Sequence, residues 1–433
     1  MSTLRFLRRL QPARRHTLRW SALVSLWITA AVRGGELVTW SACVAEALTN
    51  SHELVAARAA VCASEAAVRV ARGSLLPQIS GEATVRRGEA AAGQENTAYA
   101  YGLSTSQLLF NGGKARNQLA RAEQELAVAR WRYALVSANV RQVLRQAYIN
   151  LIKGQRQVEI ARDILERRAQ SARLIGLRYE GGREHRGSLL TAQARQMEAE
   201  YELRRTEREL QVARQNLAAA LGRRAVAEFF AVEDLAIPTV AEQAPPFAQL
   251  AAATPEVQLK QAESEAARFS WKAVQAERIP VVEASAAYER RDTEWPVEED
   301  EWSAGLRMYV PLFTGYRNTA AAGQARAAWE AAAATVEDVG NQAVARLRAA
   351  WVDLCSAVEW VAVQSGYVEA ARERSRIADE QYSTGLLSFD NWIIIEDEFI
   401  RTRKALLEAQ TAAWIAEARW LYACGKTLEN EQK

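Results

Sequence analysis

Polar and apolar residues alternate in four short stretches of this chain, two in each half. In the first stretch the odd positions from Ile79 to Val85 are apolar or small, and the even positions are polar. The other stretches begin at Tyr99, Val282 and Trp302. A period of two places alternate side chains on opposite faces, which predicts β-strands with one apolar and one polar face. We expect two hairpins, over residues 77–110 and 280–313.

A long segment without proline follows each predicted hairpin. Residues 114–180 and 318–382 contain no proline, so each segment can form one continuous helix. Such a helix would be roughly 100 Å long at about 1.5 Å per residue. Apolar residues recur every seven positions from Leu119 to Ala147, which is typical of a coiled-coil seam. The return helices expected after these segments cover residues 188–221 and 391–423.

This order of parts occurs twice, with a constant offset of 203 residues. The turn at residues 109–112 recurs at 312–315, and Tyr179 recurs as Tyr382. A constant offset predicts two structural repeats with almost no insertions between them. The expected divisions are a first repeat over 36–226, an equatorial link over 227–249, a second repeat over 250–426 and a C-terminal tail over 427–433.

The N-terminus has the pattern of a secretory signal peptide. Six arginines precede an apolar run of 13 residues from Trp20 to Val32, which is too short to span a bilayer. We therefore expect a cleaved signal peptide over residues 1–35; a retained basic anchor helix is the alternative. Its removal lowers Lys+Arg from 55 to 48 against 52 acidic residues, so the net charge changes from +3 to −4. This change argues against a nucleic-acid partner.

Four cysteines lie in alanine-rich helical patterns, and none forms a CxxC motif. We interpret all of them as buried small apolar residues, with disulfides as the alternative. Lipidation of Cys43 is a further possibility, although no leucine lies three residues before it. The four positions are Cys43, Cys62, Cys355 and Cys424.

The predicted strands suit a membrane, but four of them cannot close a barrel. Each is about ten residues long, the length that a tilted transmembrane strand needs. Aromatic residues near one end of the strands are typical of a membrane-interface girdle. On alternation alone, hairpins on a soluble surface are equally compatible with the pattern. The predicted interface aromatics are Tyr99, Tyr101, Tyr288 and Trp302.

Open strand edges would be unsatisfied in lipid, so closure requires further chains. Three copies would supply twelve strands, within the range of outer-membrane barrels. Polar strand faces would then line a lumen, and apolar faces would contact lipid. The long helices would form a ring outside the membrane, because they are amphipathic and charged.

Five motifs, in order along nearly the whole mature chain, resemble those of the TolC-like outer-membrane efflux proteins, or outer membrane factors. They lie at residues 38–54, 76–78, 108–113, 178–182 and 311–315. The resemblance implies a mixed α and β membrane protein. It would be a homotrimer with a 12-stranded barrel in outer-membrane lipid and a long antiparallel α-helical barrel across the periplasm.

The resemblance also implies partners and a function. The partners would be a periplasmic adaptor (membrane fusion) protein and an inner-membrane pump or ABC exporter. The chain would be the exit channel of a tripartite efflux or type I secretion system, conducting small molecules or unfolded protein without catalysis or cofactor. A soluble periplasmic coiled-coil adaptor or scaffold is the alternative, and a metal-exporting channel is another. No ligand cluster supports metal specificity, and no nucleophile-base set supports an enzyme.

Adaptor docking, by the same resemblance, involves the turns between the long helices. These turns are Gly182-Arg183 and Gly385-Leu386 in this chain. The two glycines also predict helix C-caps, which favour a positive φ angle. Docking and capping are compatible.

The resemblance further implies an entrance constriction, in which this chain departs from the family pattern. The gate tyrosine matches Tyr382, but the gate arginine position holds Leu387. The gate aspartate positions hold Ser188, Asn391 and Ile394, and Asp390 lies beside the usual place. We therefore expect no double ring of acidic residues of the usual form. We expect an entrance that binds cations more weakly than those of the acidic-ringed members.

Overall fold

The computed structural model describes residues 36–89, 95–224, 228–232, 235–241 and 243–432. The signal peptide expected over residues 1–35 lies outside the described residues. So do parts of the expected link over 227–249, so its irregular character is described only in part.

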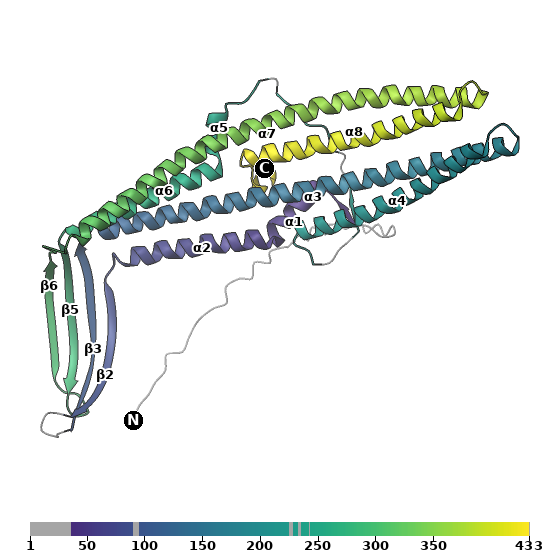
Figure 1. The fold of residues 1–433 in the computed structure, drawn as a ribbon. Helices are drawn as coiled ribbons and strands as arrows, with labels where there is room; N and C mark the ends of the chain where they lie inside the picture. Colours follow the sequence, from purple (N-terminus) through teal and green to yellow (C-terminus); the bar gives the residue numbers. More distant parts are fainter. Residues whose placement is uncertain (1–35, 90–94, 225–227, 233–234, 242, 433) are drawn as a thin grey trace, which may run out of the picture. The chain divides into compact units, whose positions relative to one another are not determined.

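Two antiparallel helix pairs form most of the described chain (Figure 1). In the first pair α3 has 67 residues and α4 has 35; in the second α7 has 68 and α8 has 35. α7 begins 203 residues after α3, and α8 begins 203 residues after α4. The bounds are Lys114–Glu180 for α3, Arg186–Ala220 for α4, Arg317–Thr384 for α7 and Phe389–Ala423 for α8.

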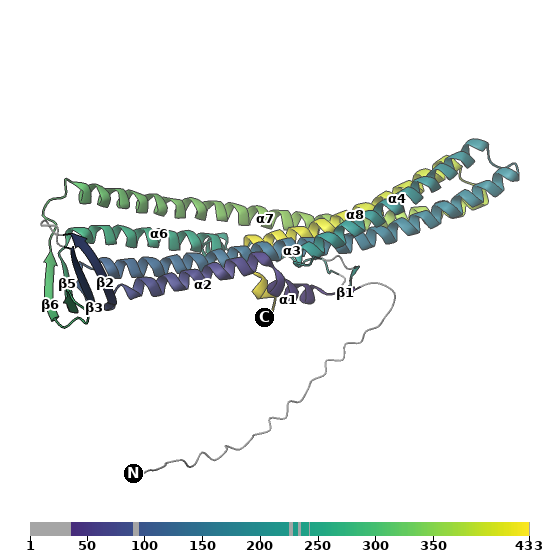
Figure 2. The same ribbon diagram turned by 90° about the horizontal axis from the view of Figure 1, so that it is seen from below.

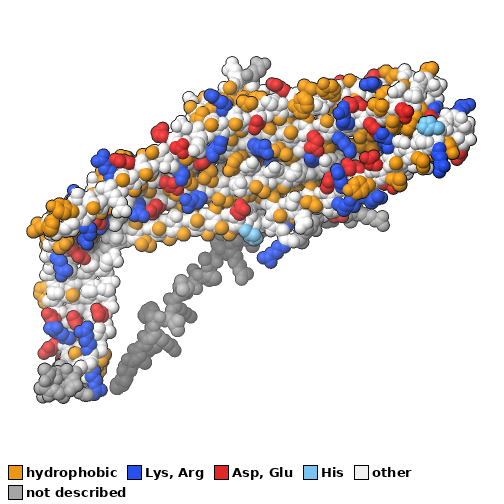
Figure 3. Space-filling view, viewed as in Figure 1, with side chains coloured by type: hydrophobic (Ala, Val, Ile, Leu, Met, Phe, Trp, Pro, Cys, Tyr) orange, Lys and Arg blue, Asp and Glu red, His pale blue; other side chains and the backbone are white. Residues whose placement is uncertain are grey.

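Two shorter helices extend alongside the halves of α3 and α7 that the return helices leave free. α2 (His52–Gly73) packs against α3, and α6 (Pro255–Gln275) packs against both α3 and α7 (Figure 2). Ser51 caps α2, and Pro255 occupies the first turn of α6. On the face seen in Figure 3, basic and acidic side chains are interspersed along the helices.

The four predicted strands form one antiparallel sheet in the order β2-β3-β5-β6. Leu103 lies opposite Tyr288, and Tyr288 lies opposite Trp302. Directly opposed residues share a face, so this register gathers the apolar residues of all four strands on one face. The bounds are Gln78–Glu89 for β2, Glu95–Phe110 for β3, Val281–Asp292 for β5 and Asp300–Tyr309 for β6.

The apolar face of the sheet is open to solvent in the single chain. Ile79 is 75% exposed, Leu306 is 73% exposed and Trp302 is 76% exposed. The hairpins are therefore not packed against the helices of their own chain through this face. A large exposed apolar face marks contact with another protein or with a membrane.

A small waist domain beside the middle of α3 was not anticipated in detail. β1 (Glu36–Val38) pairs in parallel with β4 (Phe229–Ala231), and α1 (Trp40–Asn50) follows β1. Strands of three residues are too short for alternation to show, which is why the sequence did not reveal them. The remaining elements are α5 (Phe247–Ala253), η1 (Ala276–Arg278) and η2 (Leu428–Gln432).

The core at this waist joins segments from distant parts of the sequence. Tyr148, Leu217 and Phe229 are fully buried together, with Trp414 from α8. Arg223 adds charged contacts, because its guanidinium lies 2.6 and 2.8 Å from the carboxylate oxygens of Glu36. The beginning of the described chain is thereby fixed to the end of α4.

The C-terminal tail docks on α3 through two carboxylates. Glu429 accepts hydrogen bonds from Tyr133 and Ser137, both at 2.6 Å. Glu431 accepts one from Nε of Arg141 at 2.7 Å. Trp40 of α1 donates to the other oxygen of Glu431 at 3.0 Å. The tail thus connects α1 to α3.

Acidification should weaken this docking. Burial raises the pKa of each carboxyl, but hydrogen bonds from the partners just named lower it further, so the pKa of Glu429 and of Glu431 lies below the ordinary glutamate value. A carboxyl group whose pKa is lowered in the folded state stabilises the fold at pH values above its unfolded-state pKa of about 4.3. This stabilisation disappears as the pH falls through the folded-state pKa. We expect the Tm of detergent-solubilised protein to fall below about pH 4.5.

The matched variants are Glu429→Gln with Glu431→Gln, and Asp390→Asn as a control at the exposed start of α8. The double variant should lose part of the acid-dependent change in Tm, and the control should keep it. Equal pH dependence in all three proteins would contradict the role given to the tail.

Candidate functional site

An apolar cluster closes the ends of the two helix pairs at the side away from the sheet. All four long helices contribute to it. Tyr382 is 2% exposed in this cluster, and its ring stacks on Trp392 with centroids 4.6 Å apart. Its buried members are Ala172, Ile175, Ala192, Ala378, Tyr382, Phe389, Trp392 and Ile393.

Tyr382 also connects the two helix pairs through polar contacts. The guanidinium of Arg178, in the last turn of α3, lies 4.3 Å from the Tyr382 ring centroid and donates to the Tyr382 carbonyl at 2.9 Å. The Tyr382 hydroxyl donates to Glu184 at 3.0 Å. Burial and the Glu184 carboxylate raise the pKa of Tyr382 to about 12, so the hydroxyl remains a donor at neutral pH.

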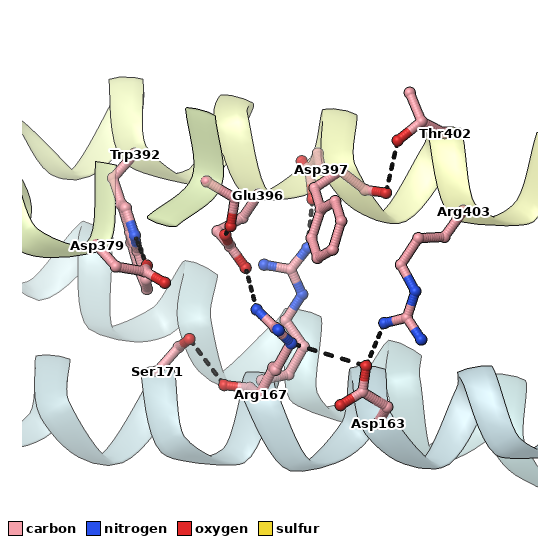
Figure 4. Close-up of polar contacts among 12 residues, drawn as sticks. Asp163, Arg167, Ser171, Asp379, Trp392, Glu396, Asp397, Thr402 and Arg403 are labelled. Carbon is pink, nitrogen blue, oxygen red and sulfur yellow. Dashed lines mark hydrogen bonds and ion pairs between the residues drawn. The ribbon is translucent and has the colours of Figure 1, made fainter. Parts of the chain in front are cut away.

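Further from the tips, ionic contacts cross from α8 to the other helix pair (Figure 4). Asp397 of α8 accepts from Arg195 of α4 at 2.6 Å and also from Arg168 of α3. Arg403 pairs with Asp163 of α3. The Arg168 side chain is only 7% exposed. We call the contacts of Asp397 with Arg168 and Arg195 the ionic bridge.

A buried carboxylate lies one residue before Asp397, whose own side chain is 41% exposed. Glu396 is 4% exposed, accepts a hydrogen bond from Ser375 and lies 3.8 Å from the Arg167 guanidinium. Removing one partner from a buried charged contact is strongly destabilising, because the other charge stays buried and unpaired. Charged side chains thus connect the two helix pairs at this level.

Asp390 and Asn391, two of the predicted entrance residues, lie exposed in the first turn of α8. Ser188 is 1% exposed, in the first turn of α4. Its backbone N–H donates to Nδ1 of His185 at 3.1 Å, and its hydroxyl lies 3.2 Å from Nε2. Tyr382 and Ser188 are thus buried, whereas Asp390 and Asn391 face solvent.

The two predicted docking turns are exposed at the ends of the helix pairs. Gly182 has φ 67° and Gly385 has φ 84°, angles that favour glycine. Leu386 is 82% exposed, and Arg183 is exposed as well. Their role in docking remains a prediction.

The predicted interface aromatics lie together toward the hairpin end of the sheet. Tyr288 opposes Trp302 across the strands, and Tyr99 contacts Trp295 with centroids 5.9 Å apart. A second apolar collar at the strand-to-helix junction was missed. It includes Leu312, Phe313 and Tyr316, which are 93%, 76% and 76% exposed. The Leu-Phe pairs at residues 109–110 and 312–313 are the feature of the sequence that indicates this collar.

The cysteines correct one expectation. Cys43 is 1% exposed, but Cys62 is exposed, and Cys355 and Cys424 are half-buried. None of the four forms a disulfide with another. Burial of Cys43 in the waist core also argues against lipidation, because a lipid chain on its sulfur would have to displace core side chains.

Within the described ranges, no helix has an apolar stretch long enough to cross a membrane. The same residues contain no group of three or more histidine, cysteine or carboxylate side chains placed to hold a metal ion.

The sequence matches the model of the outer membrane efflux protein family over residues 43–223 and 248–425. It is 22% identical to the outer membrane efflux protein BepC of Brucella suis over 429 residues, which cover 95% of this chain and 92% of BepC. Solved structures share the fold. VceC of Vibrio cholerae matches with a TM-score of 0.78 and 20% identity, over 90% of this chain and 96% of VceC. The open state of the Neisseria gonorrhoeae MtrE channel matches with a TM-score of 0.79 and 18% identity, over 90% of each chain.

Proposed function

This chain belongs to the outer membrane efflux protein family, and from that membership we propose that three copies form the exit channel of a tripartite efflux or type I secretion system. The protein is located in the outer membrane, and its helical part lies in the periplasm. The channel passively conducts small molecules or unfolded protein supplied by an inner-membrane pump or ABC exporter. The soluble-adaptor alternative is not favoured.

The observation that carries this proposal is the open sheet. β2 and β6 each have one hydrogen-bonded neighbour, so each presents a free edge. Lipid offers no hydrogen bonds to such an edge. Pairing β6 of one copy with β2 of the next closes twelve strands from three copies, turns the apolar face outward and encloses the polar face.

The proposal is tested in planar lipid bilayers. Purified protein should form water-filled pores, and a chain lacking residues 78–110 should form none, because half of its strands are missing. Failure of the intact, folded protein to conduct ions would overturn the proposal.

The exposed turns at the helix tips support docking of a periplasmic adaptor. Leu386 offers an apolar contact and Arg183 a charge, each beside a glycine that fixes the turn. Leu386→Asp should therefore abolish export of the channel's cargo in cells while leaving pore formation in bilayers unchanged. Loss of both activities would instead indicate a folding defect.

We further propose that the ionic bridge and the buried Tyr382 hold the entrance in its closed arrangement. The position of the family's gate arginine holds Leu387, which contributes to the apolar cluster instead. The charged contacts between the helix pairs lie farther along the helices, at Asp397.

The entrance should bind multivalent cations weakly. Asp390 is the acidic residue in the first turn of α8, where Asn391 and Ile394 replace the family's aspartates. We expect a trivalent cation to block the pore only at high concentration. Asn391→Asp with Ile394→Asp should strengthen the block by about tenfold, because both positions are exposed and would form acidic rings. Tight block of the unaltered channel would show this expectation to be wrong.

A further inference from the structure

The apolar collar at the strand-to-helix junction is one of the most exposed hydrophobic surfaces of the chain. Both halves contribute a Leu-Phe pair to it. Leu109 and Phe110 are about half exposed, and Leu312 and Phe313 are more exposed still. Figure 3 shows hydrophobic side chains gathered where the sheet meets the helices. Apolar side chains gathered on a surface indicate a partner outside the chain.

Tyr316, which completes the collar, occupies a backbone position that favours glycine. It precedes α7 with φ 63°, and Gly113 precedes α3 at the corresponding position of the first half with φ 83°. In the described ranges no other residue except glycine has a positive φ angle. The Tyr316 ring contacts Phe313 edge to face, with centroids 5.7 Å apart, and remains largely exposed. Packing within the chain therefore does not explain a strained tyrosine here, which indicates a role for its ring outside the chain.

The collar continues the apolar face of the sheet at the distance of a second membrane interface. Leu306 and Met308 lie on the same face of β6 as Trp302, and both are exposed. The ten residues from Trp302 to Leu312 correspond to roughly 33 Å of extended chain. With the strand tilt of about 35–45° found in barrels, this length crosses a height of roughly 25 Å, which is the height of the apolar band between the two aromatic girdles of outer-membrane barrels. The collar thus lies where the periplasmic surface of the membrane is expected.

Basic residues follow the collar at the ends of the four helical segments nearest the sheet, which are α2, α3, α6 with η1, and α7. The six residues of each segment that lie nearest the sheet include six basic residues in total and one acidic residue. The acidic residue, Glu277, pairs with Lys114 at 2.8 Å. Arg278 lies beside the start of α7, because it donates to the Asn318 carbonyl at 3.4 Å. We call the six basic residues the basic belt: Arg69, Arg72, Lys114, Arg116, Arg278 and Arg317.

Apolar side chains followed by basic ones match the polarity of a membrane surface that contains anionic phospholipids. The collar suits the boundary of the acyl chains, and the basic belt suits the phosphates, which attract arginine and lysine. Tyrosine fits such a boundary, because its ring is apolar and its hydroxyl is polar. Except for Lys114, the residues of the basic belt are exposed, so their charges are accessible to a lipid headgroup.

We propose that the apolar collar and the basic belt bind anionic phospholipids of the periplasmic leaflet and fix the depth at which the barrel sits in the outer membrane. The inference rests on the proposed function, because only a closed barrel places the collar against lipid around its circumference. It goes beyond that function by assigning a lipid partner to residues outside the sheet. A second copy of the chain is the alternative occupant of the collar, and the test distinguishes the two.

Native mass spectrometry with added lipid tests the proposal. Purified channel in detergent is titrated with phosphatidylglycerol, which is anionic, or with phosphatidylcholine, which has no net charge. The unaltered protein should bind phosphatidylglycerol more tightly than phosphatidylcholine. Arg278→Gln with Arg317→Gln should weaken phosphatidylglycerol binding about fivefold and leave phosphatidylcholine binding unchanged. The control is Arg374→Gln with Arg376→Gln, which removes the same charge from exposed positions near the far end of α7.

Tyr316→Gly separates the apolar contribution from folding. Both lipids should bind about twofold more weakly, because an apolar contact is lost whatever the headgroup. The Tm in detergent should not fall, because glycine adopts a positive φ angle without strain. Dissociation of the oligomer by this substitution, or unchanged lipid binding, would overturn the inference and indicate that a second copy covers the collar.

The unaltered channel supplies a readout if the double arginine variant does not fold. Its preference for phosphatidylglycerol should weaken when ammonium acetate is raised from about 0.1 M to about 1 M, since the screening length falls from about 10 Å to about 3 Å. Equal affinity for the two lipids, or an equal loss in the control variant, would contradict the inference. Absence of an oligomer in the unaltered protein would count against the proposed function instead.

Discussion

Arginine in place of Leu306 should prevent the chain from accumulating as a folded oligomer in the outer membrane. Leu306 is 73% exposed on the apolar face of β6, between Trp302 near one end and the apolar collar at the other. An arginine on the lipid face near the bilayer midplane costs about 2–4 kcal/mol per chain, and three copies would carry it. Fractionated membranes should contain little heat-resistant oligomer.

The matched control is Ser303→Arg on the same strand. Ser303 is exposed and opposes Ala287 on the polar face, where an arginine would face water. We expect this variant to insert at nearly the normal level. Equal insertion of the two variants would mean that the apolar face does not contact lipid.

Alanine in place of Asp397 should open the entrance and raise single-channel conductance several-fold. The substitution removes the carboxylate that both Arg168, whose side chain is 7% exposed, and Arg195 contact. Leaving a buried charge unpaired costs about 3–5 kcal/mol, which favours any arrangement that exposes Arg168 to water. Separation of α8 from α3 and α4 achieves this exposure.

Glu398→Ala provides the control on the adjacent position of α8. Glu398 pairs with Arg401 on the same helix, and the Arg401 side chain is 76% exposed. Surface pairs of this kind contribute about 0.3–0.5 kcal/mol, so conductance should remain near normal. If Asp397→Ala conducts no more than Glu398→Ala, the ionic bridge does not hold the entrance closed.

Local patterns in the sequence predicted the long elements well. The absence of proline indicated that α3, which begins at Lys114 and ends at Glu180, could form one continuous helix. Alternation of polar and apolar residues predicted four strands, and these correspond to β2, β3, β5 and β6. Both signals depend on neighbouring residues, so a single sequence contains them.

Contacts between distant residues could not be predicted in the same way. Arg168 and Asp397 are 229 positions apart, and neither has a sequence context that identifies its partner. The hydrogen bond that Ser137 donates to Glu429 joins residues that are 292 positions apart in the sequence. Such pairs depend on how the helices align, which local periodicity does not specify.

Some residues of the candidate site could be identified from the sequence, but their contacts with other residues could not. Tyr382 was identified through the resemblance to a family, and the structure adds its burial and its contact with Glu184. The cap formed by His185 on Ser188 was not expected, because a serine in a helical segment has the same sequence signal whether it lines a channel or binds a neighbouring side chain.

Native mass spectrometry of protein released from detergent micelles tests the main conclusion most directly. One chain supplies a sheet with two free edges, so a stable particle must contain enough copies to pair them. We predict a single species with three times the mass of the processed chain. A monomer that stays folded and dispersed in water without detergent would contradict the proposal that three chains enclose one channel.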